Sequence, residues 1–239
     1  MVALGIRHAK ASESALDGGY SQTFESYERA ASMSEAVVCM PPGRLMPIAC
    51  DEGLLATFML QIEGQMRIAQ DNEFDSVRSS FEEAYFPGYS SEIRFGALSM
   101  DGAGHVAYGS CAVSLKNSAI ESRASVFEFP LYAFSQGLNL ARPIPAGHRA
   151  DWGNRGRLAS TKAGVVLSGA SPGQYQNILL PPPTTTTSDC VEVHIYGALN
   201  VHSIKSVSFY RSVRQADIVI QDVIAEALSV KSIPVRMVE

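Results

Sequence analysis

Glu192, His194 and Tyr196 occupy alternate positions of the segment VEVHIYG, which follows the loop PPPTTTTSDC. In an extended strand alternate side chains point to the same side, so these three polar groups are expected to share one face. A fixed carboxylate can stabilise the positive charge that develops on a sugar when a glycosidic bond breaks. The same alternation also occurs in an ordinary strand with one solvated face. The segment therefore predicts either a solvated strand face or the wall of an active site.

The segments around this strand contain further groups suited to ligand binding. Proline fixes φ and threonine hydroxyls offer hydrogen bonds, so the preceding loop is expected to form an ordered polar lip beside Glu192. Upstream, IRFGALS contributes Arg94, and AYGSCAVSL contains a Gly-Ser turn at Gly109 and Ser110. An arginine can clamp a pyrophosphate through two parallel hydrogen bonds, and a glycine lets a ligand approach the backbone closely.

The elements that would position these residues indicate an α+β fold. Residues 1–50 are expected to be a leader with a short helix near 23–34, and residues 51–239 a single catalytic domain. Helices come first, then many short strands, then one helix and a strand, which differs from βαβ alternation. The apolar periodicity predicts helices at 51–68, 74–85 and 215–228, a hairpin-like pair at 93–100 and 105–115, a β-rich run at 124–134, a long loop with a short helix at 141–164, a short strand or helical turn at 174–180, and strands at 191–197, 204–210 and 233–238.

From Glu192 to Phe209 the sequence follows the pattern Glu-Val-x-Ile-x-Gly-x-Leu-x-x-x-x-Ile-x-x-Val-x-Phe. This pattern resembles the catalytic-glutamate strand of ADP-ribosyltransferases, and the resemblance extends over Ile93–Glu239. It implies a split β-sandwich of ADP-ribosyltransferase type with a helical N-terminal portion. It also implies NAD as co-substrate, Glu192 as the catalytic residue, and transfer of ADP-ribose to a protein side chain. Residues 181–189 fall at the position of the target-recognition loop.

The resemblance also implies roles for other residues. NAD would be held by Arg94, Gly96, Tyr108, Gly109, Ser110 and Phe127, with Trp152 as a further aromatic ring able to stack on nicotinamide. The acceptor would be contacted by Thr187, Asp189, Cys190 and His194.

Two departures from the family pattern bear on the acceptor. Cys190 stands where many arginine-modifying members have Gln or Glu, and Ser125-Val-Phe127 replaces the usual Ser-Thr-Ser strand. In these respects the chain resembles bacterial effectors and toxins, including those that modify a threonine of ubiquitin. We therefore expect a host protein such as ubiquitin as partner, secretion without a cleaved signal peptide, and action in the host cytoplasm.

Two alternatives come from other residues. Cys111 with His148 and Asp151 could form the catalytic group of a Cys-His protease or deamidase. Against this, free cysteines are commonly buried as small core residues. The third alternative is a module without enzymatic activity that binds a partner protein through the Pro/Thr loop.

The composition narrows the classes of partner. The chain has 239 residues and a net charge of −5, which gives no broad basic surface for nucleic acid. It has no run of about 18 apolar residues that could span a membrane. None of the four cysteines forms a C-x-x-C pair, so neither a zinc ribbon nor any other metal site is expected. We expect a monomer, with His105 exposed after the DGAG turn.

Overall fold

The computed structural model describes residues 2–64, 73–135, 143–182, 189–211 and 214–238. These residues form one eight-stranded sheet with the strand order β5-β4-β6-β2-β1-β3-β7-β8. Neighbouring strands are antiparallel except for β7 and β8, which are parallel and are connected through α10. Helices pack on both faces of this sheet, so the molecule is a mixed α/β structure consistent with the expected α+β class.

The elements follow one another in this order: α1 Val2–Asp17, α2 Ser21–Ser32, β1 Glu35–Met40, α3 Pro42–Cys50, α4 Phe58–Glu63, α5 Glu73–Tyr85, β2 Ile93–Ser99, β3 Cys111–Leu115, α6 Asn117–Ile120, β4 Ala124–Phe127, α7 Leu131–Ser135, β5 Arg149–Asp151, α8 Arg155–Ala163, α9 Tyr175–Leu179, β6 Glu192–Tyr196, β7 Ile204–Tyr210, α10 Gln215–Val230 and β8 Val235–Val238.

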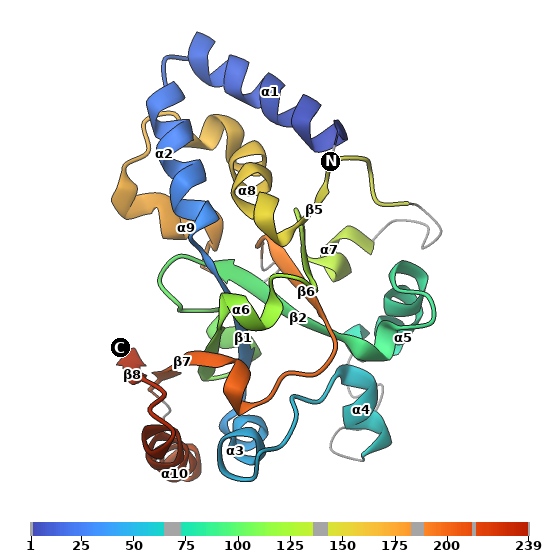
Figure 1. Ribbon diagram of the computed structural model, residues 1–239, viewed down its shortest axis with the longest axis vertical. Helices are drawn as coiled ribbons and strands as arrows, with labels where there is room; N and C mark the ends of the chain where they lie inside the picture. Colours follow the sequence, from blue (N-terminus) through green and yellow to red (C-terminus); the bar gives the residue numbers. More distant parts are fainter. Residues whose placement is uncertain (1, 65–72, 136–142, 183–188, 212–213, 239) are drawn as a thin grey trace.

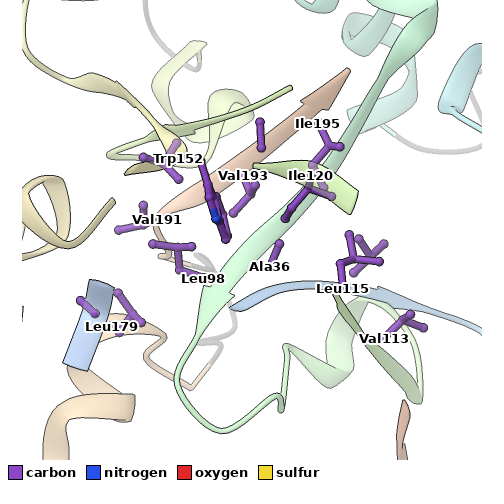
Figure 2. Close-up of a cluster of buried hydrophobic side chains, with 14 of the residues drawn as sticks. Ala36, Leu98, Val113, Leu115, Ile120, Trp152, Leu179, Val191, Val193 and Ile195 are labelled. Carbon is purple, nitrogen blue, oxygen red and sulfur yellow. The ribbon is translucent and has the colours of Figure 1, made fainter. Parts of the chain in front are cut away.

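The two faces of the sheet differ in what covers them. The core face carries Val193 and Ile195 of β6, and the larger hydrophobic core packs on it from several helices. Figure 2 shows part of this core, in which Val193, Leu98 and Ala36 from three neighbouring strands lie close to Trp152. The opposite face, here called the site face, carries Glu192 and His194.

A second, smaller cluster covers the site face over β4, β6 and β2. It is mainly aromatic and comes from α5, the segment after it, and the region of α7 (Figure 1). Its buried members are Phe81, Phe86, Ile93, Phe127 and Leu131. Because this cluster lies over the strand that begins with Glu192, it determines how much of that strand reaches solvent.

The N-terminal fifty residues are not a leader, which corrects the domain boundary expected from the sequence. They contain α1, α2, α3 and β1, and β1 is a central strand paired with both β2 and β3. The apolar run EAVVCM has the short length and buried pattern of a central strand. Helix α2 confirms the helix expected near 23–34, since Phe24, Tyr27 and Ala31 are buried at helical spacing.

Other predicted elements are confirmed or corrected by the pairing of strands. Helices α5 and α10 and strands β2, β4, β6, β7 and β8 lie where the sequence patterns predict them. The prediction that β2 and β3 form a hairpin-like pair is wrong, because β1 lies between these two strands in the sheet. The helix expected at 51–68 is reduced to α4 among the described residues, and Thr57 caps the start of α4 by accepting a hydrogen bond from Leu60.

Candidate active site

The Glu192 carboxylate is held by the protein at one of its two oxygens. Oε2 accepts a hydrogen bond of 2.8 Å from the backbone N–H of Leu131 and lies 2.7 Å from Nε2 of His194. The Glu192 side chain is 14% exposed. Oε1 accepts no hydrogen bond from the part of the chain that the structure describes. One oxygen is therefore fixed, and the other is left for a ligand.

His194 lies on the same face, two residues further along β6, and is only 2% exposed. Its ring centroid lies 5.0 Å from that of Phe86 and 5.3 Å from that of Phe95. Burial lowers the pKa of His194, and this outweighs the opposite effect of the Glu192 carboxylate. The expectation that a shared face brings Glu192 and His194 together is confirmed. Contact of His194 with a protein acceptor is contradicted by its burial.

Helix α5 places an ion pair close to the same carboxylate. Nε of Arg78 lies 2.5 Å from Oε1 of Glu82, and the Arg78 guanidinium lies 5.4 Å from the centroid of the Phe95 ring. Burial raises the pKa of Glu82, Arg78 lowers it, and the nearby negative charge of Glu192 raises it further. Two carboxylates that influence each other in a desolvated setting are typical of functional sites.

A second guanidinium, that of Arg149, shares the site face with Glu192. Arg149 of β5 lies opposite Phe127 of β4, and Phe127 lies opposite Glu192 of β6. Two strand spacings, about 10 Å, therefore separate the backbone of Arg149 from that of Glu192. Nε and Nη2 of Arg149 donate hydrogen bonds of 3.1 and 2.9 Å to Oγ of Ser125, and the guanidinium lies 5.1 Å from the centroid of Phe86. Burial lowers the pKa of Arg149. No carboxylate of the described residues pairs with Arg149, which leaves its charge available to an anion.

Arg94 lies on the core face, away from Glu192, which corrects its place in the expected NAD site. It is the register partner of Ile195, whose side chain points into the core. Arg94 is 4% exposed and donates hydrogen bonds to the carbonyl oxygens of Leu55 and Glu92. Its guanidinium therefore joins the segment before α4 to the segment before β2.

Gly96 and Gly109, the two glycines expected beside NAD, instead lie where neighbouring backbone segments approach closely. Gly96 also lies on the core face, and a Cβ there would come 2.8 Å from the carbonyl oxygen of Val37. Gly109 has a φ of +139°, and a Cβ there would come 2.0 Å from the backbone of Met40. Each glycine is therefore required by the approach of neighbouring backbone, and neither lies next to Glu192.

Tyr108 and Ser110 lie at the start of β3, which β1 and β2 separate from β6. Tyr108 is 56% exposed and its ring contacts that of His105. Oγ of Ser110 accepts a hydrogen bond of 3.3 Å from Gln221 of α10. The structure does not bring this pair to the Glu192 carboxylate. His105 is itself 4% exposed, which corrects the expectation that it faces solvent.

Phe127 and Trp152 are too buried to stack on a ligand. Phe127 is directly opposite Glu192 in the register but is fully buried, and its ring lies 6.1 Å from that of His194. Trp152 is 3% exposed, and the guanidinium of Arg155 lies 4.3 Å from its ring. Phe127 therefore belongs to the wall around His194, and Trp152 belongs to the core.

The residues just before β6 are anchored by α8 and by the loop before β3. Nζ of Lys162 lies 2.6 Å from Oδ1 of Asp189 and donates a hydrogen bond of 2.9 Å to the carbonyl oxygen of Cys190. Nε2 of His105 lies 3.3 Å from the carbonyl oxygen of Asp189. Asp189 keeps a half-exposed side chain, whereas Cys190 is buried. Thr187, the remaining residue expected at the acceptor, lies outside the described residues.

The expected pairing of Cys111 with His148 is wrong. Four strands separate β3 from β5, which corresponds to about 24 Å across the sheet. Cys111 is fully buried, and burial raises the pKa of its thiol to about 12. Nδ1 of His148 lies 2.8 Å from Oε2 of Glu128, while Oδ1 of Asp151 accepts the backbone N–H of Asn154. Cys111 is therefore not an activated thiolate, and His148 does not lie beside it as a base.

The sequence did not identify four residues near Glu192 as site residues, although it contains a pattern typical of one contact among them. The four are Arg78, Glu82, Leu131 and Arg149. Arg78 and Glu82 are four residues apart on a predicted helix, which is the spacing of a helical ion pair. Nothing in that spacing places the pair over β2. Arg149 and Leu131 join the site only through strand pairing and through a backbone N–H, neither of which has a sequence signature.

Two hollows in the structure lie away from Glu192. One is a cavity of about 10 Å³ between β1, β3 and α3, and the other lies between the end of α10 and β8. Among the described residues, no group of three or more His, Cys, Asp or Glu side chains is arranged to hold a metal ion. Within the same residues, no helix combines the length and apolar character needed to cross a membrane.

Comparison of the sequence with models of known protein families gives no match. Comparison with curated proteins gives no significant match either.

Proposed function

We propose that the chain is an NAD-dependent ADP-ribosyltransferase in which Glu192 is the catalytic residue. The observation that carries the proposal is the half-occupied carboxylate of Glu192. It is largely buried, it is fixed at Oε2 by two donors, and its Oε1 has no partner among the described residues. The finer description of the single eight-stranded sheet as the split β-sandwich of that family is part of the proposal and rests on the family resemblance.

The reaction would break one bond and form another at C1′ of the ribose next to nicotinamide. The bond from C1′ to the nicotinamide nitrogen breaks, and the nitrogen keeps the electron pair. A nucleophilic atom of the acceptor bonds to C1′ and loses its proton. Positive charge develops on the ribose between these events, and Oε1 of Glu192 would stabilise it and accept a hydrogen bond from a ribose hydroxyl.

Arg149 would take the part in NAD binding that the family resemblance implies for Arg94. It lies on the same face as Glu192, about 10 Å away across β4, and no described carboxylate neutralises it. A planar guanidinium matches the oxygens of a pyrophosphate in geometry and charge. Ser125 holds Nε and Nη2 in place, so the charged group is oriented before NAD arrives.

The acceptor would approach along β6. Asp189 before the strand and Tyr196 at its end are about half-exposed, whereas His194 between them is buried. A host protein such as ubiquitin as acceptor, the role of a bacterial effector or toxin, and action in the host cytoplasm after secretion without a cleaved signal peptide are parts of the proposal that rest on the family resemblance.

Release of nicotinamide from NAD tests the bond-breaking half of this proposal. Glu192→Gln removes the negative charge with little change in shape, so we expect the rate to fall about 10²–10³-fold. Glu226→Gln, at an exposed position of α10, is the matched control and should keep the wild-type rate. Equal rates for the wild type and Glu192→Gln would contradict the assignment of Glu192.

A further inference from the structure

The imidazole of His194 lies directly behind the Glu192 carboxylate and is enclosed by aromatic rings. Phe86 and Phe95 meet it nearly edge to face, with interplanar angles of 83° and 74°, and Phe127 lies on a third side. Rings packed this closely in a protein interior hold one orientation. In that orientation Nε2 faces Oε2 of Glu192 at 2.7 Å.

The hydrogen bond fixes the chemical form of the imidazole. A carboxylate can only accept, so the hydrogen of this bond is on Nε2. Nδ1 is buried and has no hydrogen-bond partner among the described residues, as expected for the ring nitrogen that carries no hydrogen. Burial lowers the pKa of His194, so the ring stays neutral near pH 7. It therefore gives Glu192 one hydrogen bond and leaves the negative charge of the carboxylate intact.

The second donor to Oε2 of Glu192 comes from another part of the chain, at the start of α7. The backbone N–H of Leu131, at the start of α7, is 2.8 Å from Oε2. Two donors on one oxygen restrict rotation of the carboxylate about its last side-chain bond. The direction of Oε1 is then set by the positions of His194 and Leu131.

We propose that His194 is a positioning residue, whose Nε2–H acts with the N–H of Leu131 to hold Oε2 of Glu192 and aim Oε1 at the ribose of NAD. This inference rests on the proposed function and deepens it. With 2% of its surface exposed, His194 acts through Glu192 and touches neither NAD nor the acceptor.

Two substitutions separate the hydrogen bond from the packing of the ring. His194→Phe keeps a ring in the aromatic pocket but removes the donor, and His194→Gln keeps an N–H donor on a side chain of similar reach. We expect His194→Phe to lower kcat for nicotinamide release about 10–100-fold, with little change in the KM for NAD. His194→Gln should recover most of that loss, and His202→Phe at an exposed position should match the wild type.

Nuclear magnetic resonance of the ¹⁵N-labelled imidazole gives a readout that does not depend on turnover. The expected spectrum of the protein without NAD has the Nε2–H tautomer of His194, with a proton protected from exchange. In Glu192→Ala this proton resonance should shift and lose its protection, because its acceptor is gone.

The outcomes distinguish this inference from the proposed function. If the wild type cleaves NAD and folded His194→Phe is equally active, the positioning role is overturned while the transferase stands. An Nδ1–H tautomer or a charged ring near pH 7 also overturns it, whether or not His194→Phe folds. Wild-type protein that releases no nicotinamide overturns the proposed function, and the positioning role is overturned with it.

Discussion

Arg94 of β2 and Arg149 of β5 lie on opposite faces of the sheet. Arg149 is on the site face with Glu192 and has no described carboxylate partner, whereas Arg94 is on the core face and is bonded to backbone carbonyls. Of these two arginines, Arg149 is the one placed to reach a ligand that also contacts Glu192.

Replacement of Arg149 by lysine tests this assignment at the scale of one residue. Lysine keeps the positive charge but loses the planar pair of donors, so we expect the KM for NAD to rise about tenfold or more with a smaller effect on kcat. The measurement is the dependence of nicotinamide release on NAD concentration. Arg157→Lys, at an exposed position of α8, is the control. A KM for Arg149→Lys equal to that of the wild type would exclude Arg149 from the NAD site.

Two buried histidines make stability depend on pH. Burial lowers the pKa of His194 and of His105 below the value of about 6.5 that histidine has in an unfolded chain. As the pH falls through about 6.5, the unfolded chain binds protons that the folded chain does not, so the free energy of unfolding decreases. Their contribution is complete above that pH and is lost below it.

We therefore expect the urea midpoint of the wild type to fall between about pH 7.5 and about pH 5, and to fall less in His194→Phe. His202→Gln removes an exposed histidine and should keep the wild-type dependence. A drop in His194→Phe as large as that of the wild type would show that His194 takes up a proton equally well in the folded and unfolded chain.

At the scale of elements, α1 is attached to the sheet beside the site. Nη1 of Arg7 donates a hydrogen bond of 2.7 Å to Oε2 of Glu128, and Nη2 donates one of 3.0 Å to Oε1. Nη1 also donates a hydrogen bond of 2.7 Å to the carbonyl oxygen of Gly147. Glu128 directly follows β4 and is 5% exposed. Helix α1 therefore supports the segment that leads from β4 to Leu131.

Removal of this contact should destabilise the whole fold. Arg7→Ala leaves the Glu128 carboxylate buried without its guanidinium, which we expect to lower the free energy of unfolding by about 3 kcal/mol. Equilibrium unfolding in urea measures the change. Arg29→Ala removes a 3.9 Å pair on the surface of α2 and should have little effect. A value for Arg7→Ala as small as that for Arg29→Ala would show that α1 is not held by this pair.

The elements also show what the sequence could predict. The alternation in VEVHIYG placed Glu192 and His194 on one face correctly, because side-chain direction within a strand is local. Whether that face is exposed to solvent depends on residues that are distant in the sequence. Phe86, more than a hundred positions earlier in the chain, packs on His194 and removes it from water. The central position of β1 has the same cause, since strand pairing joins distant segments.

At the scale of the whole molecule, the sheet order decides which side chains can work together. It brings β5, β4 and β6 side by side, so that Arg149, Phe127 and Glu192 lie in one row. The same order keeps Cys111 and His148 apart and leaves Tyr108 at a distance from Glu192. Register between strands is set by the packing of complete faces, so single motifs could not reveal it.

Transfer of labelled ADP-ribose from NAD to proteins of a host-cell lysate tests the proposed function most directly. The comparison is between purified wild type, Glu192→Gln and Glu226→Gln. We expect a discrete labelled protein with the wild type and with Glu226→Gln, and a loss of label with Glu192→Gln. Label of equal strength with Glu192→Gln, or no labelled protein with the wild type, would contradict an ADP-ribosyltransferase that acts through Glu192.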